Sequence, residues 1–289
     1  MDERIFARLA ALLETAPVAV ASVLATRGAT PRKRGSRMLV TPEESEFSIG
    51  GGEAEARVLA TARALLAREA SAEEFHIDLS GGADSAGVCG GTMDLALRRW
   101  NEAEDCERAR QVSWLLAAGD MCDLSPGDLG GGNEVQQACP DARLLIVGGG
   151  HCALALCELA RHLDFEIVVY DPHGDPAALA ALPGARTLAG GSDALAKALA
   201  TSRPIYAVLL NRDFGSDVAA LSVLRTRPPV FIGMMGSRRR IAEVTRALGD
   251  DGTFAQQLQA PVGLDIDAQT PHEIAVSILA QLIAERRSR

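Results

Sequence analysis

Hydrophobic and polar positions follow different patterns in the two halves of the chain. From residue 143 onward, short apolar runs alternate with longer stretches of helical periodicity. The runs are apolar throughout, which predicts strands buried on both faces. Strands that alternate with helices in this way are typical of a parallel sheet covered by helices. The runs are Leu144–Val147, Ile167–Tyr170, Tyr206–Leu210 and Val230–Ile232.

The first hundred residues mix helical and strand patterns without a regular alternation. One helix is predicted at Glu3–Thr15, and another follows the glycine run that ends at Gly52 and continues to about Ala70. Turn-rich segments containing Gly and Pro separate the apolar stretches. The predicted strands are Val18–Leu24, Arg37–Val40, Phe75–Leu79 and Thr92–Leu97.

Together the two patterns predict an α/β protein with a parallel-sheet C-terminal half. We expect a small N-terminal α/β domain over residues 1–100, a helix and linker over 101–141, and a Rossmann-type domain over 142–289. The last helix is marked by Thr270-Pro-His-Glu273, which supplies a cap, a proline in the first turn and an acidic third position.

Composition and charge narrow the class of ligand and the compartment. The 289 residues carry a net charge of −9, which leaves no overall basic footprint for nucleic acid. Nucleotides remain open as ligands, because backbone N–H groups bind their phosphates locally. Met1–Arg4 leads into an amphipathic helix, and no apolar run approaches the ~18 residues of a membrane span. We therefore expect a cytoplasmic protein. Its six cysteines, which form no CxxC pair, are expected to be reduced.

A glycine motif follows the first strand of the C-terminal half. Gly148-Gly-Gly-His-Cys-Ala153 matches G-x-G-x-x-A, with Asp171 at the end of the next strand. Gly148 would allow the tight turn, and Gly150 would let backbone N–H groups approach a pyrophosphate. Asp171 would accept hydrogen bonds from a ribose hydroxyl, which favours NAD over NADP. A Rossmann fold without a ligand is the alternative.

Further candidates lie at two helix starts. His151 and Cys152 open the helix after the glycine motif, where they would meet a bound phosphate; packing is the other reading of Cys152. Gly236, Ser237 and Arg238 follow the fourth apolar run and predict a second anion site. A capped helix with a solvated basic end explains the same residues.

The N-terminal half holds a second set of candidates. Arg37 belongs to a basic cluster that begins at Arg32, while Gly51 and Gly52 lie in a glycine run that could form an anion-binding nest. Ordinary turn chemistry is the alternative. Cys89, followed by two glycines, is a candidate thiolate ligand or nucleophile. The spacing of His and Cys around it does not predict a zinc site.

From these residues alone two functions stay open. An NAD-dependent oxidoreductase would use Gly148–Ala153 and Asp171, with His151 as the general acid near the motif. A nucleotide-sensing module would need only the binding site. The spacing offers no Ser/His/Asp or paired-carboxylate arrangement, so hydrolase chemistry lacks support.

Taken together and in order, these blocks resemble the XdhC/CoxI family of accessory proteins of molybdenum hydroxylases such as xanthine dehydrogenase. The resemblance covers nearly the whole chain. It is carried by Gly28–Val40, Ile49–Gly52, Cys89–Gly91, Gly148–Ala153, Phe231–Arg240, Pro261–Ile266 and Thr270–Ala275.

The resemblance implies a chaperone rather than a conventional enzyme. Such proteins bind the molybdenum cofactor, as molybdopterin or a dinucleotide form. They protect it while a cysteine desulfurase supplies its sulfido ligand, and they deliver it to the apo molybdenum hydroxylase. The resemblance also implies a homodimer, with the cofactor phosphate on Gly148–Ala153 and the pterin-dithiolene end at the N-terminal loops. Cys89 would contact molybdenum or its sulfur.

Overall fold

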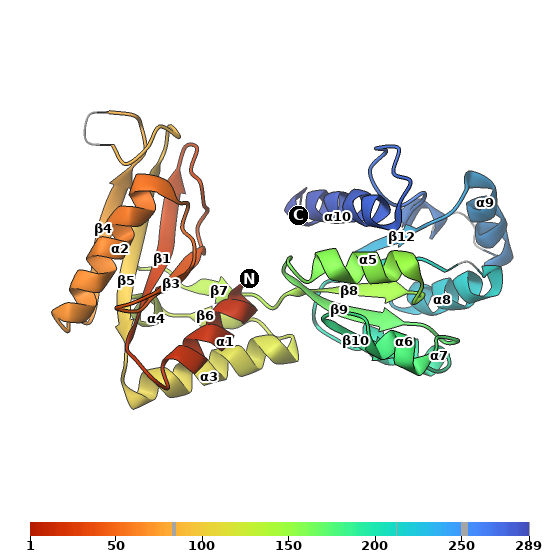
Figure 1. Ribbon diagram of the computed structural model, residues 1–289, viewed down its shortest axis with the longest axis horizontal. Coiled ribbons are helices and arrows are strands. Elements are labelled where there is room, and N and C mark those ends of the chain that lie inside the picture. Colours follow the sequence, from red (N-terminus) through yellow and green to blue (C-terminus); the bar gives the residue numbers. More distant parts are fainter. Residues whose placement is uncertain (83–84, 212, 250–253, 289) are drawn as a thin grey trace. The chain divides into compact units, whose positions relative to one another are not determined.

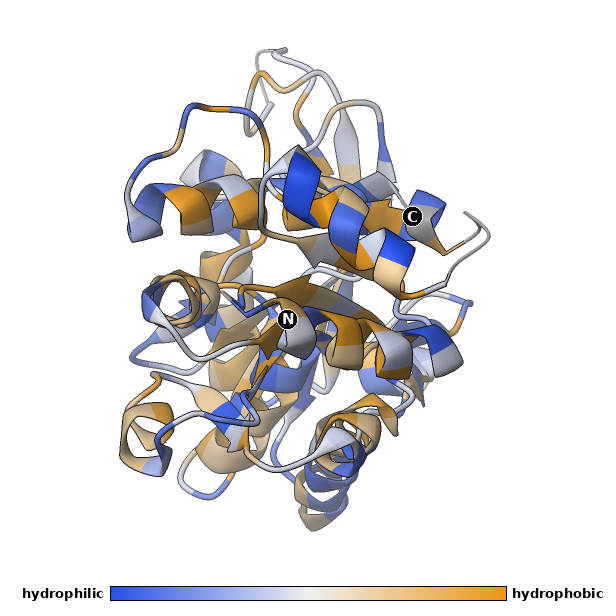
Figure 2. Ribbon diagram, turned by 90° about the vertical axis from the view of Figure 1, so that its right-hand side faces the viewer, coloured by the Kyte–Doolittle hydropathy of each residue, from blue (hydrophilic) through white to orange (hydrophobic). Residues whose placement is uncertain are grey.

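The computed structural model describes residues 1–82, 85–211, 213–249 and 254–288. The chain divides into two compact units, Met1–Pro140 and Asp141–Arg289 (Figure 1). Each unit is built on its own sheet and has its own core. The strands are coloured mostly as hydrophobic in Figure 2, whereas the helices also carry hydrophilic stretches. Among the described residues, no helix combines the length and the apolar character that crossing a bilayer requires.

The first unit contains an antiparallel five-stranded sheet of order β3-β2-β1-β5-β4. Its elements are α1 (Asp2–Leu12), β1 (Val18–Arg27), β2 (Arg37–Val40), β3 (Ser45–Phe47), α2 (Gly52–Ala67), β4 (Ala72–Asp78), β5 (Thr92–Trp100), α3 (Ala103–Ala118), β6 (Cys122–Leu124), α4 (Pro126–Leu129) and β7 (Gln136–Ala138). Alternate residues of β1 face opposite sides: Ala19 and Ala21 pack in the α2 cluster, whereas Val18 and Val20 pack with α1 and α3.

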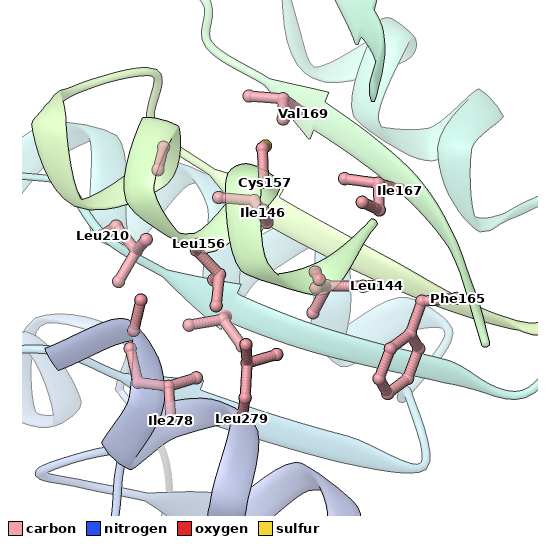
Figure 3. Close-up of a cluster of buried hydrophobic side chains, with 14 of the residues drawn as sticks. Leu144, Ile146, Leu156, Cys157, Phe165, Ile167, Val169, Leu210, Ile278 and Leu279 are labelled. Carbon is pink, nitrogen blue, oxygen red and sulfur yellow. The ribbon is translucent and has the colours of Figure 1, made fainter. Parts of the chain in front are cut away.

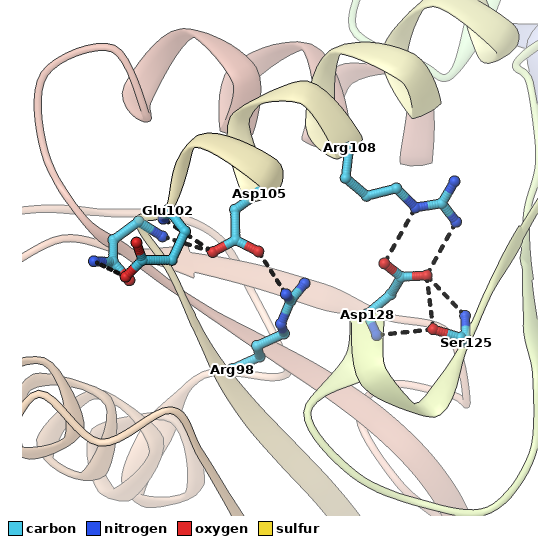
Figure 4. Close-up of polar contacts among 7 residues, drawn as sticks. Arg98, Glu102, Asp105, Arg108, Ser125 and Asp128 are labelled. Atoms are coloured by element: carbon cyan, nitrogen blue, oxygen red, sulfur yellow. Dashed lines mark hydrogen bonds and ion pairs between the residues drawn. The ribbon is translucent and has the colours of Figure 1, made fainter.

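Residues 101–140 belong to this first unit, which differs from the predicted helix and linker. The helix α3 packs against α1, and the segment also holds α4 and the hairpin β6–β7. Two ion pairs fasten it, as Figure 4 shows: Arg98 of β5 binds Asp105 of α3, and Arg108 of α3 binds Asp128 of α4. The sequence pattern does not predict β6 and β7, because each strand is only three residues long.

The second unit contains a parallel six-stranded sheet of order β10-β9-β8-β11-β12-β13. In chain order this is 3-2-1-4-5-6, the Rossmann arrangement, which confirms the predicted fold class. Its elements are β8 (Ala142–Val147), α5 (His151–Ala160), β9 (Phe165–Tyr170), α6 (Pro176–Ala180), β10 (Ala185–Leu188), α7 (Ser192–Leu199), β11 (Ile205–Leu209), α8 (Phe214–Thr226), β12 (Phe231–Met234), α9 (Arg238–Ala247), η1 (Ala255–Gln257), β13 (Leu258–Gln259) and α10 (Pro271–Ser288).

Helices cover both faces of this sheet, as the continuous apolar runs predicted. Leu144 and Ile146 of β8 point toward α5 and α10, where they pack with Leu156 and Ile278 (Figure 3). Leu145 and Val147 of β8 point to the opposite face and pack toward α7, α8 and α9. His272 of α10 bonds Glu158 of α5 at 2.8 Å, which ties the two helices on the first face together.

Candidate functional site

The glycine loop lies where the strand order of the parallel sheet reverses. Strands β9 and β11 flank β8, and Gly148–Gly150 connects the carboxyl end of β8 to α5. In open α/β sheets, ligands bind outside the carboxyl ends of the strands at such a reversal. The fold therefore places the predicted motif where a nucleotide-like ligand would bind.

The three glycines of this loop differ in the space around them. Gly148 has φ +106°, and a Cβ there would lie 2.7 Å from Oδ1 of Asn211. Gly150 begins α5 as its N-cap, and a Cβ there would meet nothing within 4 Å. Gly148 is thus required by the turn, whereas the position of Gly150 keeps open space above the loop.

Backbone N–H groups face that open space. In the described part of the chain, the N–H groups of Gly150, His151 and Cys152 have no acceptor, as expected for the first turn of a helix. The positive end of the helix dipole adds to their attraction for an anion. His151 is exposed beside them, whereas Cys152 is half-buried against the core on the α5 face.

The carboxylate of Asp171 holds the glycine loop in place. Its Oδ2 accepts from the N–H of Gly149 at 2.8 Å, and its Oδ1 accepts from the N–H of His173 at 3.0 Å. Sequence reasoning assigned Asp171 only to a ribose hydroxyl, and that contact stays a prediction. The loop-holding role was not predicted, because it depends on the close approach of two strand ends.

Two cavities open at the same edge of the sheet, on opposite faces. The first, of about 400 Å³, lies between the ends of β8 and β9 and the starts of α7 and α8; Val147, Tyr170, Leu195 and Ser216 are among its lining residues. The second, of about 670 Å³, lies beside β12 and α10 and is lined by Gly236 and the Pro261–Ala268 segment. Sequence reasoning assigned neither cavity to a ligand, because side chains from distant segments form both.

The second predicted anion site lies at the start of α9. Ser237 caps this helix by accepting from the N–H of Arg240 at 3.3 Å, and Gly236 precedes it with φ +151°. The Arg240 guanidinium contacts the buried carboxylate of Asp217 at 2.6 Å and so is directed into the fold. Burial raises the pKa of Asp217 more than Arg240 and Asn211 lower it. The side chain of Arg238 lies outside the described residues.

The structure brings the three predicted N-terminal loops together. A Cβ on Gly91 would lie 2.4 Å from the carbonyl oxygens of Arg27 and Ala29, so the segment after Cys89 packs directly on the loop after β1. A Cβ on Gly50 would lie 2.4 Å from Cγ of Pro31, so the glycine run packs on the same loop. Glycine is needed at both contacts because the backbones approach closely.

The glycine run forms a nest that one of the chain's own carboxylates fills. Oε2 of Glu55 accepts from the N–H groups of Ile49 and Gly51 at 3.2 and 3.0 Å, and from the Ser48 hydroxyl at 2.6 Å. Burial raises the pKa of Glu55, but the hydrogen bonds from these donors lower it by more. The pKa of Glu55 therefore lies below its ordinary value. Gly51 therefore has an internal anion bonded to its N–H group. The contact of Gly51 and Gly52 with a cofactor stays a prediction.

Arg37 is held by partners inside the first unit, and its contact with a cofactor stays a prediction. Its side chain is 1% exposed, and its guanidinium bonds Asp2 at 2.5 Å, the carbonyl of Gly35 at 3.0 Å and Oε1 of Gln136 at 3.1 Å. These acceptors direct the charge into the core of the first unit. The basic run from Arg32 suggested a surface role, but Arg37 opens β2, where its side chain points inward.

Cys89 lies exposed in the loop between β4 and β5. Its neighbour Val88 is 88% exposed, so this turn projects from the first unit. Among the described residues, no group of three or more His, Cys, Asp or Glu is arranged to hold a metal ion. The thiol is therefore accessible as a single ligand, and the assignment of a molybdenum or sulfur contact to it remains a prediction.

Comparison with known proteins identifies the family. A model of the XdhC Rossmann domain matches residues 144–282, and a model of the XdhC and CoxI family matches residues 11–78. A crystal structure of a xanthine dehydrogenase from Bacillus halodurans superposes with a TM-score of 0.83 at 24% identity, covering 100% of this chain and 96% of that one. At this identity the superposition shows the shared fold.

Two curated proteins are similar in sequence. The uncharacterized protein YqeB of Escherichia coli K12 is 30% identical over 288 residues, which is 96% of this chain and 46% of the relative. A Bacillus subtilis protein, described as a probable subunit of xanthine dehydrogenase, is 27% identical over 157 residues, covering 53% of this chain and 46% of that protein. The chain thus spans less than half the length of each. The two family matches, in the order that the motifs predicted, show that this chain belongs to the XdhC and CoxI family.

Proposed function

We propose that this chain binds the molybdenum cofactor and acts in the maturation of a molybdenum hydroxylase such as xanthine dehydrogenase. In this proposal it protects the cofactor while a cysteine desulfurase supplies the sulfido ligand, and it then delivers the cofactor to the apo-hydroxylase. The similarity to a protein described as a probable subunit of xanthine dehydrogenase supports this choice of client. The proposal also includes a cytoplasmic location and a homodimer.

The observation that carries the proposal is the open start of α5. Every form of the cofactor bears a phosphate or pyrophosphate, which requires hydrogen-bond donors and positive potential. The N–H groups of Gly150, His151 and Cys152, which have no acceptor among the described residues, supply donors, and the open position at Gly150 supplies room. These residues fit the phosphate end of the cofactor. The cofactor itself supplies the molybdenum and its redox chemistry.

The remaining predicted residues take supporting roles in the proposal. His151 is exposed beside the phosphate position and would donate a hydrogen bond to it. Asp171 holds the loop that surrounds this position. Cys89 is proposed to contact molybdenum or its sulfur, which its exposed thiol favours, since a thiolate is a soft metal ligand.

An NAD-dependent oxidoreductase is the second candidate, because a cavity beside the glycine loop would accept the nucleoside of NAD. The cavity of about 400 Å³ beside the glycine loop is large enough for a nucleoside, and Val147 and Leu195 give it apolar walls. A cytosine dinucleotide form of the molybdenum cofactor would use the same cavity. The cavity therefore favours a nucleotide-bearing ligand without distinguishing these two.

Reconstitution of a client separates the two functions. The purified chain would be loaded with sulfurated cofactor under anaerobic conditions and mixed with apo xanthine dehydrogenase. We expect hydroxylase activity to appear with the loaded chain and to stay low with an equal amount of cofactor and albumin. Equal activity in both mixtures would refute delivery. In parallel, saturable binding of NADH together with turnover of an added substrate would establish the oxidoreductase instead.

A further inference from the structure

The cavity of about 670 Å³ beside β12 and α10 has a wall that is fixed in place. We call residues Pro261–Ala268 the Asp loop; they follow β13 and precede α10. The N–H of Val262 donates to the carbonyl of Met234 at 3.0 Å, and the N–H of Gly263 donates to Oε1 of Gln281 at 2.6 Å. Ser277 of α10 donates its hydroxyl to the carbonyl of Leu264 at 2.6 Å and accepts from the N–H of Leu264 at 3.2 Å through its own carbonyl. The cavity is therefore preformed.

This fixed loop exposes apolar side chains to the solvent. Leu264 is 46% exposed and Ile266 is 51% exposed, and both line the cavity of about 670 Å³. Met235 and Ile274 add apolar surface at its base. Removing apolar surface from water contributes about 25 cal/mol per Å² to the free energy of binding. A flat apolar ligand that covers these side chains would therefore bind favourably.

Two carboxylates alternate with these apolar residues. Asp265 and Asp267 line the same cavity, and both residues are exposed. Neither carboxylate has a hydrogen-bond or ion-pair partner in the part of the chain that the structure describes. A carboxylate is an acceptor with two parallel oxygens, so it matches a ligand edge that carries two parallel N–H donors.

We propose that this cavity binds the 2-amino-4-oxopyrimidine edge of a fused heterocycle, with Asp265 or Asp267 accepting its two N–H groups. Leu264 and Ile266 would contact the flat faces of the ring. The inference rests on the proposed function, and within it the heterocycle is the pterin of the cofactor. This edge is uncharged and donates two N–H groups, so the carboxylates attract it. The same carboxylates repel the anionic phosphate of the cofactor.

The position of the cavity suits such a ligand. Gly236 lines the cavity just after β12, and Gly148 follows β8; only β11 lies between these strands. Two strand spacings amount to about 10 Å, a distance that a pyranopterin phosphate can span. The phosphate end and the pterin ring would then both bind at the carboxyl edge of one sheet. This assignment moves the pterin ring from the N-terminal loops, where the family resemblance placed it, to the second unit.

Guanine carries the same edge as pterin, so the test must separate the two sources. The probes are 6-hydroxymethylpterin, guanosine and adenosine, each titrated into the full-length chain in the presence of EDTA and followed by calorimetry or pterin fluorescence. Adenosine lacks the edge and should not bind at this cavity. We expect the pterin to bind more tightly than guanosine. Tighter binding of guanosine would overturn the assignment to pterin.

The carboxylates are tested by the double variant Asp265→Asn/Asp267→Asn. An amide offers one acceptor and turns a donor toward the ligand's own N–H groups, so we expect pterin affinity to fall at least about 10-fold. The matched control is Asp193→Asn, an exposed aspartate at the start of α7, which should leave the affinity unchanged. Circular dichroism of all variants verifies that they fold.

The outcomes distinguish this inference from the proposed function. Unchanged pterin affinity in the folded double variant, or no pterin binding by the wild-type chain, would overturn the inference. If the wild-type chain still retains the whole molybdenum cofactor in that case, the proposed function stands. If the wild-type chain binds no pterin and retains no molybdenum cofactor, the inference and the proposed function are both overturned.

Discussion

Two charged side chains in the first unit stabilise the backbone of their own fold. Arg37 is buried and bonds Asp2, Gly35 and Gln136, whereas Glu55 accepts hydrogen bonds inside the glycine nest. The sequence shows each charge, but it does not show the partner. Gln136 lies 99 positions from Arg37, so their contact depends on how the sheet packs against the β6–β7 hairpin. For this reason the sequence does not reveal the packing role of Arg37.

Replacing Arg37 tests its structural role. The variant Arg37→Ala leaves Asp2 and Gln136 without their partner and creates a cavity, so we expect the free energy of unfolding to fall by about 3 kcal/mol. Urea unfolding of the full chain measures this. The control Arg34→Ala removes an exposed ion pair with Glu134 and should cost less than about 0.5 kcal/mol. Equal stability of the Arg37 variant and the wild type would contradict the assignment.

Glu55 predicts a pH dependence on the acid side. Its pKa in the folded state lies below the ordinary value of 4.5, so its stabilising contribution is present above that pH and is lost as the pH falls through the lower folded value. We expect Glu55→Gln to lower the free energy of unfolding by about 1–2 kcal/mol at pH 7 and by less at pH 3. Glu53→Gln, at an exposed neighbour, should show little change at either pH. A constant difference for Glu55→Gln would refute this account.

At the scale of elements, the glycine loop and the apolar strands were the most predictable features. The motif after β8 was predicted because its spacing reflects a local turn, and buried strands were predicted because they are apolar throughout. The short strands β10 and β13 were missed: β10 is only half-buried, and β13 has two residues. The Asp loop was not assigned to a ligand, because its cavity forms only when α10 packs beside β12.

A pair of alanine variants separates the two roles of the glycine loop. Gly148→Ala forces a side chain into a positive φ and against Asn211, so we expect a loss of about 1–3 kcal/mol in the free energy of unfolding. Gly150→Ala fits the backbone, so stability should hold, but its methyl group enters the phosphate position and should weaken cofactor binding. Thermal unfolding and cofactor titration measure the two effects. Full cofactor affinity in Gly150→Ala would place the phosphate elsewhere.

At the scale of the whole molecule, the chain consists of two units that each bury both faces of a sheet. The predicted boundary near residue 141 resembles the observed division at Pro140, but residues 101–140 fold with the first unit instead of forming a linker. The alternation of strands and helices indicated the second unit because parallel strands need covering helices. The fold of the first unit was harder to predict from the sequence, because antiparallel pairing joins segments that are far apart in sequence.

Because the two units have separate cores, a destabilising change in one unit should reduce the protection of amides from hydrogen exchange in that unit alone. In Arg37→Ala, amide hydrogen exchange should accelerate across β1, β2 and β7, while amides of β8, β9 and β11 keep their wild-type protection. Mass spectrometry of peptides from the exchanged chain measures both sets. Acceleration across both sheets to the same extent would show that the units unfold together.

The central claim is that the chain holds a molybdenum cofactor at the start of α5. The most direct measurement is to purify the chain anaerobically from a host that makes the cofactor, and to identify the bound small molecule by mass spectrometry together with molybdenum analysis. The account predicts molybdopterin or its dinucleotide form in near-stoichiometric amount, and its loss in Gly150→Ala. Recovery of NAD without any pterin, or equal pterin content in Gly150→Ala and the wild type, would contradict it.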